Sequence, residues 1–222
     1  MNRAPKQATD AVVRAPLRSL ALAEHTDAVL IEEFGIWGGS IRADLVVLNG
    51  VKHGYEIKTA RDSLRRLPGQ IEAYGAVFEF ATLVSADCHI PEASKMIPPW
   101  WGIIRIAEAP GAGVQLERTR EATNNPHRRA EAVAALLWRP EAMRILTSLG
   151  LSGGIKSKPM RYLTWRLASE VPLDRLSTYV REALRARGDW RSAGRLKQYD
   201  VTSRRSAKLL RCRPLLSGHS QQ

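Results

Sequence analysis

The stretch from Ile41 to Lys58, IRADLVVLNGVKHGYEIK, decides the fold expected for this chain. Its first part is β-branched and apolar, Asn49-Gly50 is a turn signal, and the chain then returns as a partner strand. Asp44 stands among apolar residues of the first strand, and the second strand ends in Glu56, Ile57 and Lys58. Because charged groups are costly to bury without a counter-ion, this hairpin predicts a site for a cation.

The length of the turn decides whether the two acids can share a site. A two-residue loop would pair Asp44 with Tyr55 and place Glu56 on the opposite face of the sheet. A loop of three or five residues, or one bulge, pairs Asp44 with Glu56 and puts Lys58 on the same face. We therefore predict a loop with an odd number of residues, or a bulge.

The segments around the hairpin predict an α/β core over residues 17–122. Residues 1–16 are expected to be a flexible basic arm, and Leu17 to Phe34 has apolar residues at helical spacing. After the hairpin, a helix is expected from Leu67 to Phe78. Short strands are expected over 81–86, 100–106 and 114–120, with a helical turn over 91–96. This order predicts a mixed sheet flanked by helices.

Beyond residue 122 the pattern is helical. Thr123-Asn-Asn-Pro126 is the expected linker. Residues 123–193 are predicted to be a basic all-α region, with helices over 127–138, 140–149, 159–169 and 172–187. Residues 194–222 are predicted to be a basic mobile tail, because Arg, Lys and Ser dominate there.

Composition argues against membrane proteins, disulfide-rich proteins and zinc-binding proteins. No run of eighteen apolar residues is present, and the two cysteines, Cys88 and Cys212, have no partners at metal-ligand spacing. We therefore expect a cytoplasmic protein without membrane association, disulfides or a zinc site. Residues 1–120 hold 14 Lys and Arg against 14 Asp and Glu, whereas residues 121–222 hold 20 against 8. The excess of positive charge in the second half favours binding to DNA phosphates, and the alternatives are a role in solubility or an acidic protein partner.

The hairpin residues suit phosphodiester chemistry. Two carboxylates on one sheet face, with the Ile57 main-chain carbonyl between them, can hold Mg²⁺ through hard oxygen ligands, and Mn²⁺ is expected to substitute. Lys58 can stabilise negative charge on phosphorus or orient the attacking water. No small-molecule cofactor is expected.

Asp44 followed by Glu56-Ile57-Lys58 after a hairpin resembles the core signature of the PD-(D/E)XK nuclease superfamily, which has a restriction-endonuclease-like fold. The resemblance implies a further acid on the helix before the first core strand, which would be Glu33 or Glu32, with Glu33 preferred as metal ligand and catalytic residue. Some branches of the superfamily also carry a Gln and a Tyr four residues apart, matched here by Gln70 and Tyr74.

The likeness extends over about residues 27–190 to a group of small, largely uncharacterised bacterial and prophage-encoded predicted nucleases. The shared runs include PWWG at 99–102, LLWR at 136–139 and KSKP at 156–159. This similarity implies the fold and the type of reaction, and the biological role of the group is poorly defined.

Two sets of basic residues are candidate contacts for DNA. Arg61, Arg65 and Arg66 follow the strand that carries Lys58. A second set surrounds the start of an expected helix, where backbone phosphates bind readily: Lys156, Lys158, Arg161 and Arg166. The alternative for both sets is an ordinary solvated basic surface.

The leading hypothesis is a Mg²⁺-dependent deoxyribonuclease, acting in a prophage, in DNA repair or in defence. Its catalytic residues would be Asp44, Glu56, Lys58, Glu33, Gln70 and Tyr74. Two alternatives stay open, a non-catalytic DNA-binding or regulatory module on a nuclease-like scaffold and an effector that acts on RNA. A homodimer also stays open, because one site cuts one strand.

Overall fold

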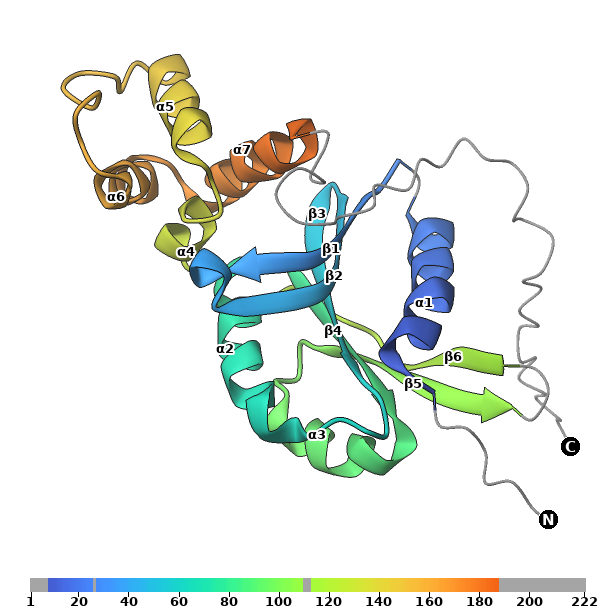
Figure 1. Cartoon of the computed structure of the whole chain (residues 1–222). Helices are drawn as coiled ribbons and strands as arrows, with labels where there is room; N and C mark the ends of the chain where they lie inside the picture. Colours follow the sequence, from blue (N-terminus) through green and yellow to red (C-terminus); the bar gives the residue numbers. More distant parts are fainter. Residues whose placement is uncertain (1–7, 26, 110–112, 188–222) are drawn as a thin grey trace, which may run out of the picture.

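The computed structural model describes residues 8–25, 27–109 and 113–187 (Figure 1). Its longer helices and its strands follow one another in this order: α1 Asp10–Glu24, β1 Val29–Ile36, β2 Ile41–Asn49, β3 Val51–Lys58, α2 Leu67–Val77, β4 Phe80–Ala86, α3 Ile90–Met96, β5 Gly102–Ala109, β6 Gly113–Arg120, α4 Ala130–Ala134, α5 Arg139–Ser148, α6 Met160–Glu170 and α7 Leu173–Ala186. The expected mixed sheet flanked by helices is confirmed, and the expected tail from residue 194 lies outside the described residues.

One six-stranded sheet forms the centre of the molecule, with its strands in sequence order from β1 to β6. The pairs β1–β2, β2–β3 and β5–β6 are antiparallel. The pairs β3–β4 and β4–β5 are parallel. The crossover between the parallel strands β3 and β4 is made by α2, as a connection between parallel strands requires.

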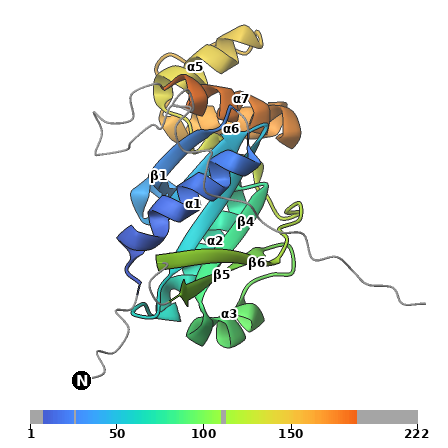
Figure 2. The ribbon, with the colours of Figure 1, turned by 90° about the vertical axis from the view of Figure 1, so that its right-hand side faces the viewer.

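Helices cover the two faces of the sheet separately. Helix α1 lies across one face (Figure 2), and its buried residues Val13, Leu17 and Ala21 pack against the side chains of that face. Helix α2 packs against the opposite face through residues that include Ala73, Tyr74 and Val77. Burial on both faces explains why several strands read as nearly continuous apolar runs.

The N-terminal part of the chain differs from the expectation. Helix α1 begins at Asp10, inside the range expected to be a flexible arm, because residues 13, 17 and 21 form an apolar stripe at helical spacing. The apolar spacing from Leu17 to Phe34 predicts one helix, or two short ones with the second beginning near Thr26-Asp27. In the structure the helix ends at Glu24, and Val29–Ile36 is strand β1. The hydrophobic pattern predicted the wrong type of element there, because a buried strand and a buried helix can both appear as nearly continuous apolar runs.

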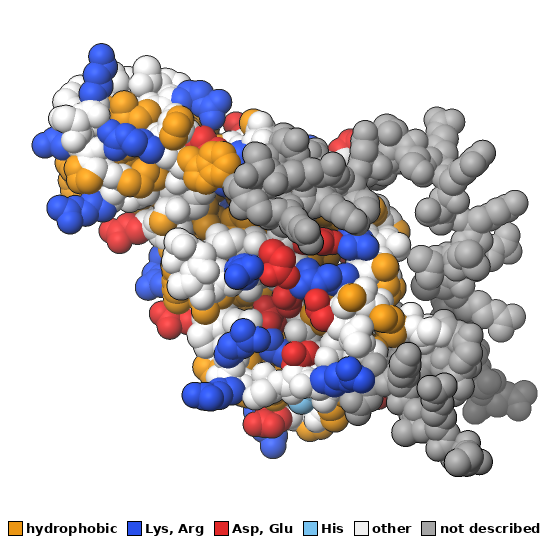
Figure 3. Space-filling view, in the orientation of Figure 1, with side chains coloured by type: hydrophobic (Ala, Val, Ile, Leu, Met, Phe, Trp, Pro, Cys, Tyr) orange, Lys and Arg blue, Asp and Glu red, His pale blue; other side chains and the backbone are white. Residues whose placement is uncertain are grey.

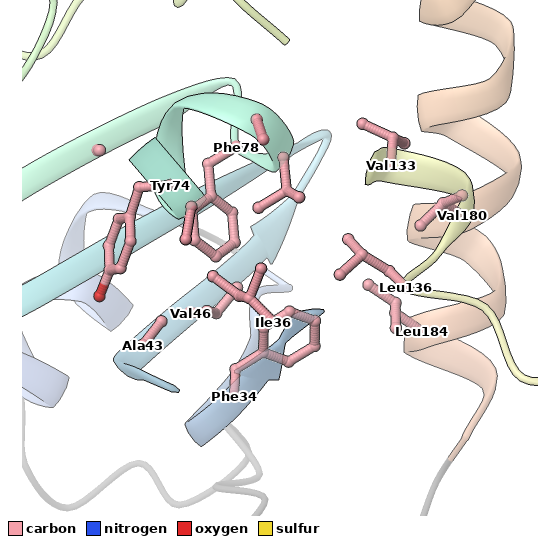
Figure 4. Close-up of a cluster of buried hydrophobic side chains, with 14 of the residues drawn as sticks. Phe34, Ile36, Ala43, Val46, Tyr74, Phe78, Val133, Leu136, Val180 and Leu184 are labelled. Carbon is pink, nitrogen blue, oxygen red and sulfur yellow. The ribbon is translucent and has the colours of Figure 1, made fainter. Parts of the chain in front are cut away.

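The helices of the second half share a hydrophobic core with the sheet. Figure 4 shows Phe34, Val46 and Phe78 on the sheet side facing Val133 and Leu184 of the helical side. The expected linker is anchored to the core, since the Asn125 side chain donates hydrogen bonds to the carbonyls of Gly75 and Phe78, both at 2.8 Å.

A buried polar cluster reinforces this junction. Lys52 of β3 is fully buried, and its ammonium group lies 2.7 Å from a carboxylate oxygen of Glu79. Ser177 of α7 bonds to both groups, and Arg128 lies 3.1 Å from Glu79. The charges are therefore paired, as burial requires. Among the described residues, no helix is long and apolar enough to cross a membrane.

Candidate functional site

The hairpin has the register that brings the two acids together. Asn49 pairs with Val51 around a single loop residue, Gly50, whose φ of 66° is one that glycine adopts without strain. Leu45 pairs with Tyr55, and the same register continued by one residue sets Asp44 opposite Glu56. The prediction of an odd loop is confirmed, and the loop is one residue long instead of three or five.

Asp44 lies where the pairing of β2 and β3 ends. One of its carboxylate oxygens, Oδ2, accepts a hydrogen bond of 2.7 Å from the main-chain N–H of Ile57. Its side chain is 21% exposed. Burial, followed by the negative charge of Glu56, raises the pKa of Asp44 to about 7. The fold therefore holds this acid where its charged form is disfavoured.

Glu56 is almost fully buried and is surrounded by donors. Its Oε1 forms an ion pair with Lys58 and accepts a hydrogen bond of 2.5 Å from Gln70 Nε2. Its Oε2 accepts a hydrogen bond of 2.8 Å from the hydroxyl of Tyr74. Burial raises the pKa of Glu56, and Lys58 is the largest influence in the opposite direction. The cluster predicted from Glu56, Lys58, Gln70 and Tyr74 is thus assembled in the structure.

Gln70 and Tyr74 reach the site because they lie one turn apart on α2, on the face directed at β3. The single proton of the Tyr74 hydroxyl is shared with a second acceptor, the carbonyl of Tyr55, which lies 3.1 Å from the hydroxyl oxygen. Two donors from a helix and one from the strand itself therefore fix the orientation of the Glu56 carboxylate.

Glu33 joins the site from a strand. It was expected on a helix, but it lies in β1 between the pairs Glu32–Leu45 and Phe34–Ala43, which places it beside Asp44. Its φ of 53° is in the left-handed region, an uncommon conformation for a residue with a side chain. Glu32 is held by Arg18 of α1, so Glu33 is the acid next to Asp44.

Arg14 of α1 was missed by sequence reasoning. Its guanidinium donates to the Asp44 carbonyl at 2.8 Å and to Glu33 Oε1 at 2.5 Å, and it lies 3.3 Å from Asp44 Oδ1. It was assigned to a flexible arm, and only the 13, 17, 21 apolar stripe of α1 signals that the residue belongs to a packed helix. Acidic and basic side chains gather in the middle of the face shown in Figure 3.

The donor set fits a hard divalent cation. Asp44 and Glu56 carry carboxylate oxygens, the ligand type that such a cation prefers, and Gln70 Oε1 is a buried oxygen that accepts no hydrogen bond within the described part of the chain. A buried acceptor of this kind needs a donor or a cation near it. The described residues contain no group of three or more His, Cys, Asp or Glu side chains placed to hold a metal. Coordination by the Ile57 carbonyl stays a prediction.

A family comparison covers most of the chain: the sequence pattern of bacteriophage P4 protein cII matches residues 7–208. The chain belongs to the phage P4 cII family. Protein cII of Enterobacteria phage P4 is 37% identical to it over 81 residues, which are 36% of this chain and 31% of that protein. The matched segment thus spans about a third of the length of that curated relative.

One solved structure shows a weak likeness to this cII family member. It is the SPO1766 protein of unknown function from Silicibacter pomeroyi, with 16% sequence identity, a TM-score of 0.35, and coverage of 64% of this chain and 94% of that one. A TM-score this low assigns neither a fold nor a function.

The basic residues of this cII family member lie in two places. Arg61, Arg65 and Arg66 follow β3, so they lie beyond the strand end that carries Lys58. Lys156, Lys158, Arg161 and Arg166 lie before and within α6, in the helical region, and none of them contacts the acid cluster within the described residues. Their contact with DNA stays a prediction.

Proposed function

We propose that the chain is a metal-dependent nuclease that hydrolyses phosphodiester bonds in DNA. One observation carries the proposal: the fold places Asp44 and Glu56 close enough for the charge of one to raise the pKa of the other, beside the buried amine of Lys58. Perturbed carboxyl groups that converge with a lysine are typical of catalytic sites. The resemblance to PD-(D/E)XK nucleases supports the same reading.

In this proposal some residues hold the metal ion, and others stabilise negative charge on the phosphate. Asp44 and Glu56 would hold Mg²⁺ or Mn²⁺, with Glu33 and the Ile57 carbonyl as further predicted ligands. When bound, such an ion lowers the pKa of a coordinated water and offsets negative charge on phosphate. Gln70 and Tyr74 orient the Glu56 carboxylate. Lys58 supplies a positive charge for the phosphate, because its ammonium group lies at the same carboxylate.

A second candidate is a non-catalytic DNA-binding module. One observation favours it: the two acids have hydrogen-bond partners within the chain and need no cation for this. Each carboxylate oxygen of Asp44 and Glu56 accepts a hydrogen bond from another residue, and Arg14 offsets the negative charge of Asp44. In that case the cluster would stabilise the fold, and DNA binding would depend on the basic second half.

A cleavage assay separates the two candidates. The full chain is incubated with plasmid, linear duplex, single-stranded DNA and RNA, with Mg²⁺, with Mn²⁺ and with EDTA. We expect metal-dependent cleavage of DNA that is lost in Asp44→Ala and in Lys58→Ala. Arg175→Ala, an exposed arginine on α7, serves as the matched surface control and should cleave normally.

Three outcomes would change the proposal. Cleavage that survives both Asp44→Ala and Lys58→Ala refutes the assigned site. Salt-sensitive DNA binding without cleavage in any metal establishes the second candidate. Cleavage restricted to RNA keeps the site but changes the substrate.

A further inference from the structure

Basic side chains occur without acidic neighbours in the segment that leads through the end of α5 and the following loop into α6. Residues 142–169 contain five Lys and Arg side chains and no Asp or Glu. Lys156, Lys158 and Arg161 are exposed, and none of them forms an ion pair with a carboxylate of the described residues. In Figure 3, basic side chains are spread over the helical end of the molecule. This part of the surface therefore suits a polyanion.

Two aromatic rings lie among these charges. Trp165 is 52% exposed, a large exposure for tryptophan, and its ring centroid lies 5.6 Å from that of the half-buried Tyr162. The ammonium group of Lys158 lies 5.4 Å from the centre of the Tyr162 ring. We call Lys158, Arg161, Tyr162 and Trp165 the α6 surface. Arg161, Tyr162 and Trp165 lie on one side of the helix because they are spaced by three or four residues. Lys158 lies in the loop before the helix and joins this side through its position over the Tyr162 ring.

The opposite side of α6 is buried, so the α6 surface is held in place. Leu163 and Leu167 are fully buried in the core shared with the sheet. The preceding loop is fixed by two guanidinium groups: Arg139 donates to the carbonyls of Lys158 at 2.5 Å and Lys156 at 2.7 Å, and Arg166 donates to Gly153 at 3.1 Å. Binding groups fixed in advance lose less entropy when a ligand binds.

We propose that the α6 surface binds single-stranded nucleic acid, with bases stacked on Trp165 and Tyr162 and phosphates beside Lys158 and Arg161. Aromatic rings among cations are the combination that binds unpaired strands, because every base has a face that can stack. In a duplex the bases already stack on one another, so the rings would add little. An acidic peptide would use the cations but would gain no base stacking.

The inference rests on the proposed function, since it names the form of the nucleic acid that the nuclease would hold. A single-stranded stretch held at the helical region would tether the substrate while the acid cluster acts on the same molecule. The second half of the chain would then select the substrate, whereas the sheet would perform the chemistry.

Binding is measured on the full chain in EDTA, so that cleavage does not interfere. The probes are a fluorescent oligo-dT of about twenty nucleotides and a duplex of similar length, followed by fluorescence anisotropy over a range of salt concentrations. We expect tighter binding of oligo-dT than of the duplex. Trp165→Ala should weaken oligo-dT binding by about tenfold or more with little change in its salt dependence. Arg161→Ala should weaken binding and reduce the salt slope by roughly one.

The control uses a similar pair elsewhere in the helical region. On α7, Arg175 lies over the ring of Tyr179 at 5.7 Å, as Lys158 lies over Tyr162, but Asp174 stands beside it. Arg175→Ala should leave oligo-dT binding unchanged, and Trp165→Phe should retain most of it. Thermal melting checks that each variant is folded; if Trp165→Ala does not fold, Trp165→Gln and Trp165→Phe are compared instead.

The result separates this inference from the proposed function. Unchanged oligo-dT affinity in Trp165→Ala, or stronger binding of the duplex, overturns the inference even if metal-dependent cleavage is found. Competition by poly-glutamate as strong as that by oligo-dT also overturns it, because the surface would then recognise charge alone. Loss of oligo-dT binding in Trp165→Ala supports the inference even if the chain cleaves no DNA.

Discussion

Replacing Asp44 by asparagine should make the protein more stable at neutral and alkaline pH. Burial and the charge of Glu56 raise the pKa of Asp44 from an ordinary value of 3.8 to about 7. The folded protein therefore binds this proton more tightly than the unfolded chain does. The free energy of unfolding falls as the pH rises from about 4 to about 7, and the full penalty is present above pH 7.

The size of the effect follows from the shift. One pKa unit corresponds to about 1.4 kcal/mol, so the shift of Asp44 costs the folded protein about 4 kcal/mol near pH 8. Asparagine keeps an oxygen that can accept from the Ile57 N–H, and it removes the charge. Asp44→Asn should therefore raise the free energy of unfolding near pH 8 by up to about 4 kcal/mol. Near pH 5 the gain should fall to roughly 2 kcal/mol, because Asp44 in the folded protein is then protonated.

Urea denaturation followed by circular dichroism at several pH values, in EDTA, measures this difference. Asp62→Asn is the control, since Asp62 accepts hydrogen bonds from the N–H and hydroxyl of Thr59, both at 2.7 Å, outside the acid cluster. It should be neutral or slightly destabilising. Added Mg²⁺ should stabilise the wild-type protein but not Asp44→Asn, because only the former keeps both carboxylates.

Two results would refute this reasoning. If Asp44→Asn is less stable than the wild-type protein near pH 8, the carboxylate stabilises the fold and the cluster is structural. If the stability difference between the two proteins does not change with pH, Asp44 is not held in the environment that the structure describes.

Three further predictions follow from the same cluster. Lys58→Ala should reduce DNA cleavage by about a hundredfold or more while leaving DNA binding in EDTA within about twofold, since it removes a charge beside Glu56. Tyr74→Phe should lower the free energy of unfolding by about 1–3 kcal/mol, because the carbonyl of Tyr55 and the carboxylate of Glu56 lose a buried donor. Urea denaturation measures this loss, and a value below about 0.5 kcal/mol would contradict the prediction. Gly54→Ala should destabilise the protein by about 1–3 kcal/mol and should reduce cleavage. The reason is that a Cβ at this position would lie 2.6 Å from the Phe78 ring and 3.0 Å from the Tyr74 ring. A variant with normal activity and a normal melting temperature would show that the two rings can move without effect on the site.

The hairpin was predictable because its signals are local. The β-branched and apolar run, the Asn49-Gly50 turn signal and the positions of Asp44 and Glu56 are all contained in eighteen consecutive residues. The one-residue loop was not predictable, since an odd loop of any length gives the same parity. Gln70 and Tyr74 were also placed correctly, because residues four apart on a helix share a face whatever that helix packs against.

The N-terminal contribution to the site was not predictable in the same way. Val29 to Phe34 was expected to be helical, and its true state depends on pairing with β2, a partner that comes later in the sequence. Glu33 therefore reached the site by a different element from the one expected. Arg14 reached it because α1 packs across the opposite face of the sheet from α2, with its guanidinium at the end of the β2–β3 pairing.

By itself the sequence determined the hairpin, the spacing of its acids and lysine, and the separation of a neutral half from a basic half. Those features depend on the order of residues and on local periodicity. Only the tertiary structure decided that Glu33, not Glu32, lies beside Asp44, that Arg14 balances both acids, and that Trp165 is left exposed. Contacts of this kind form between segments that are far apart in the sequence, and local sequence patterns do not predict which of these segments pack together.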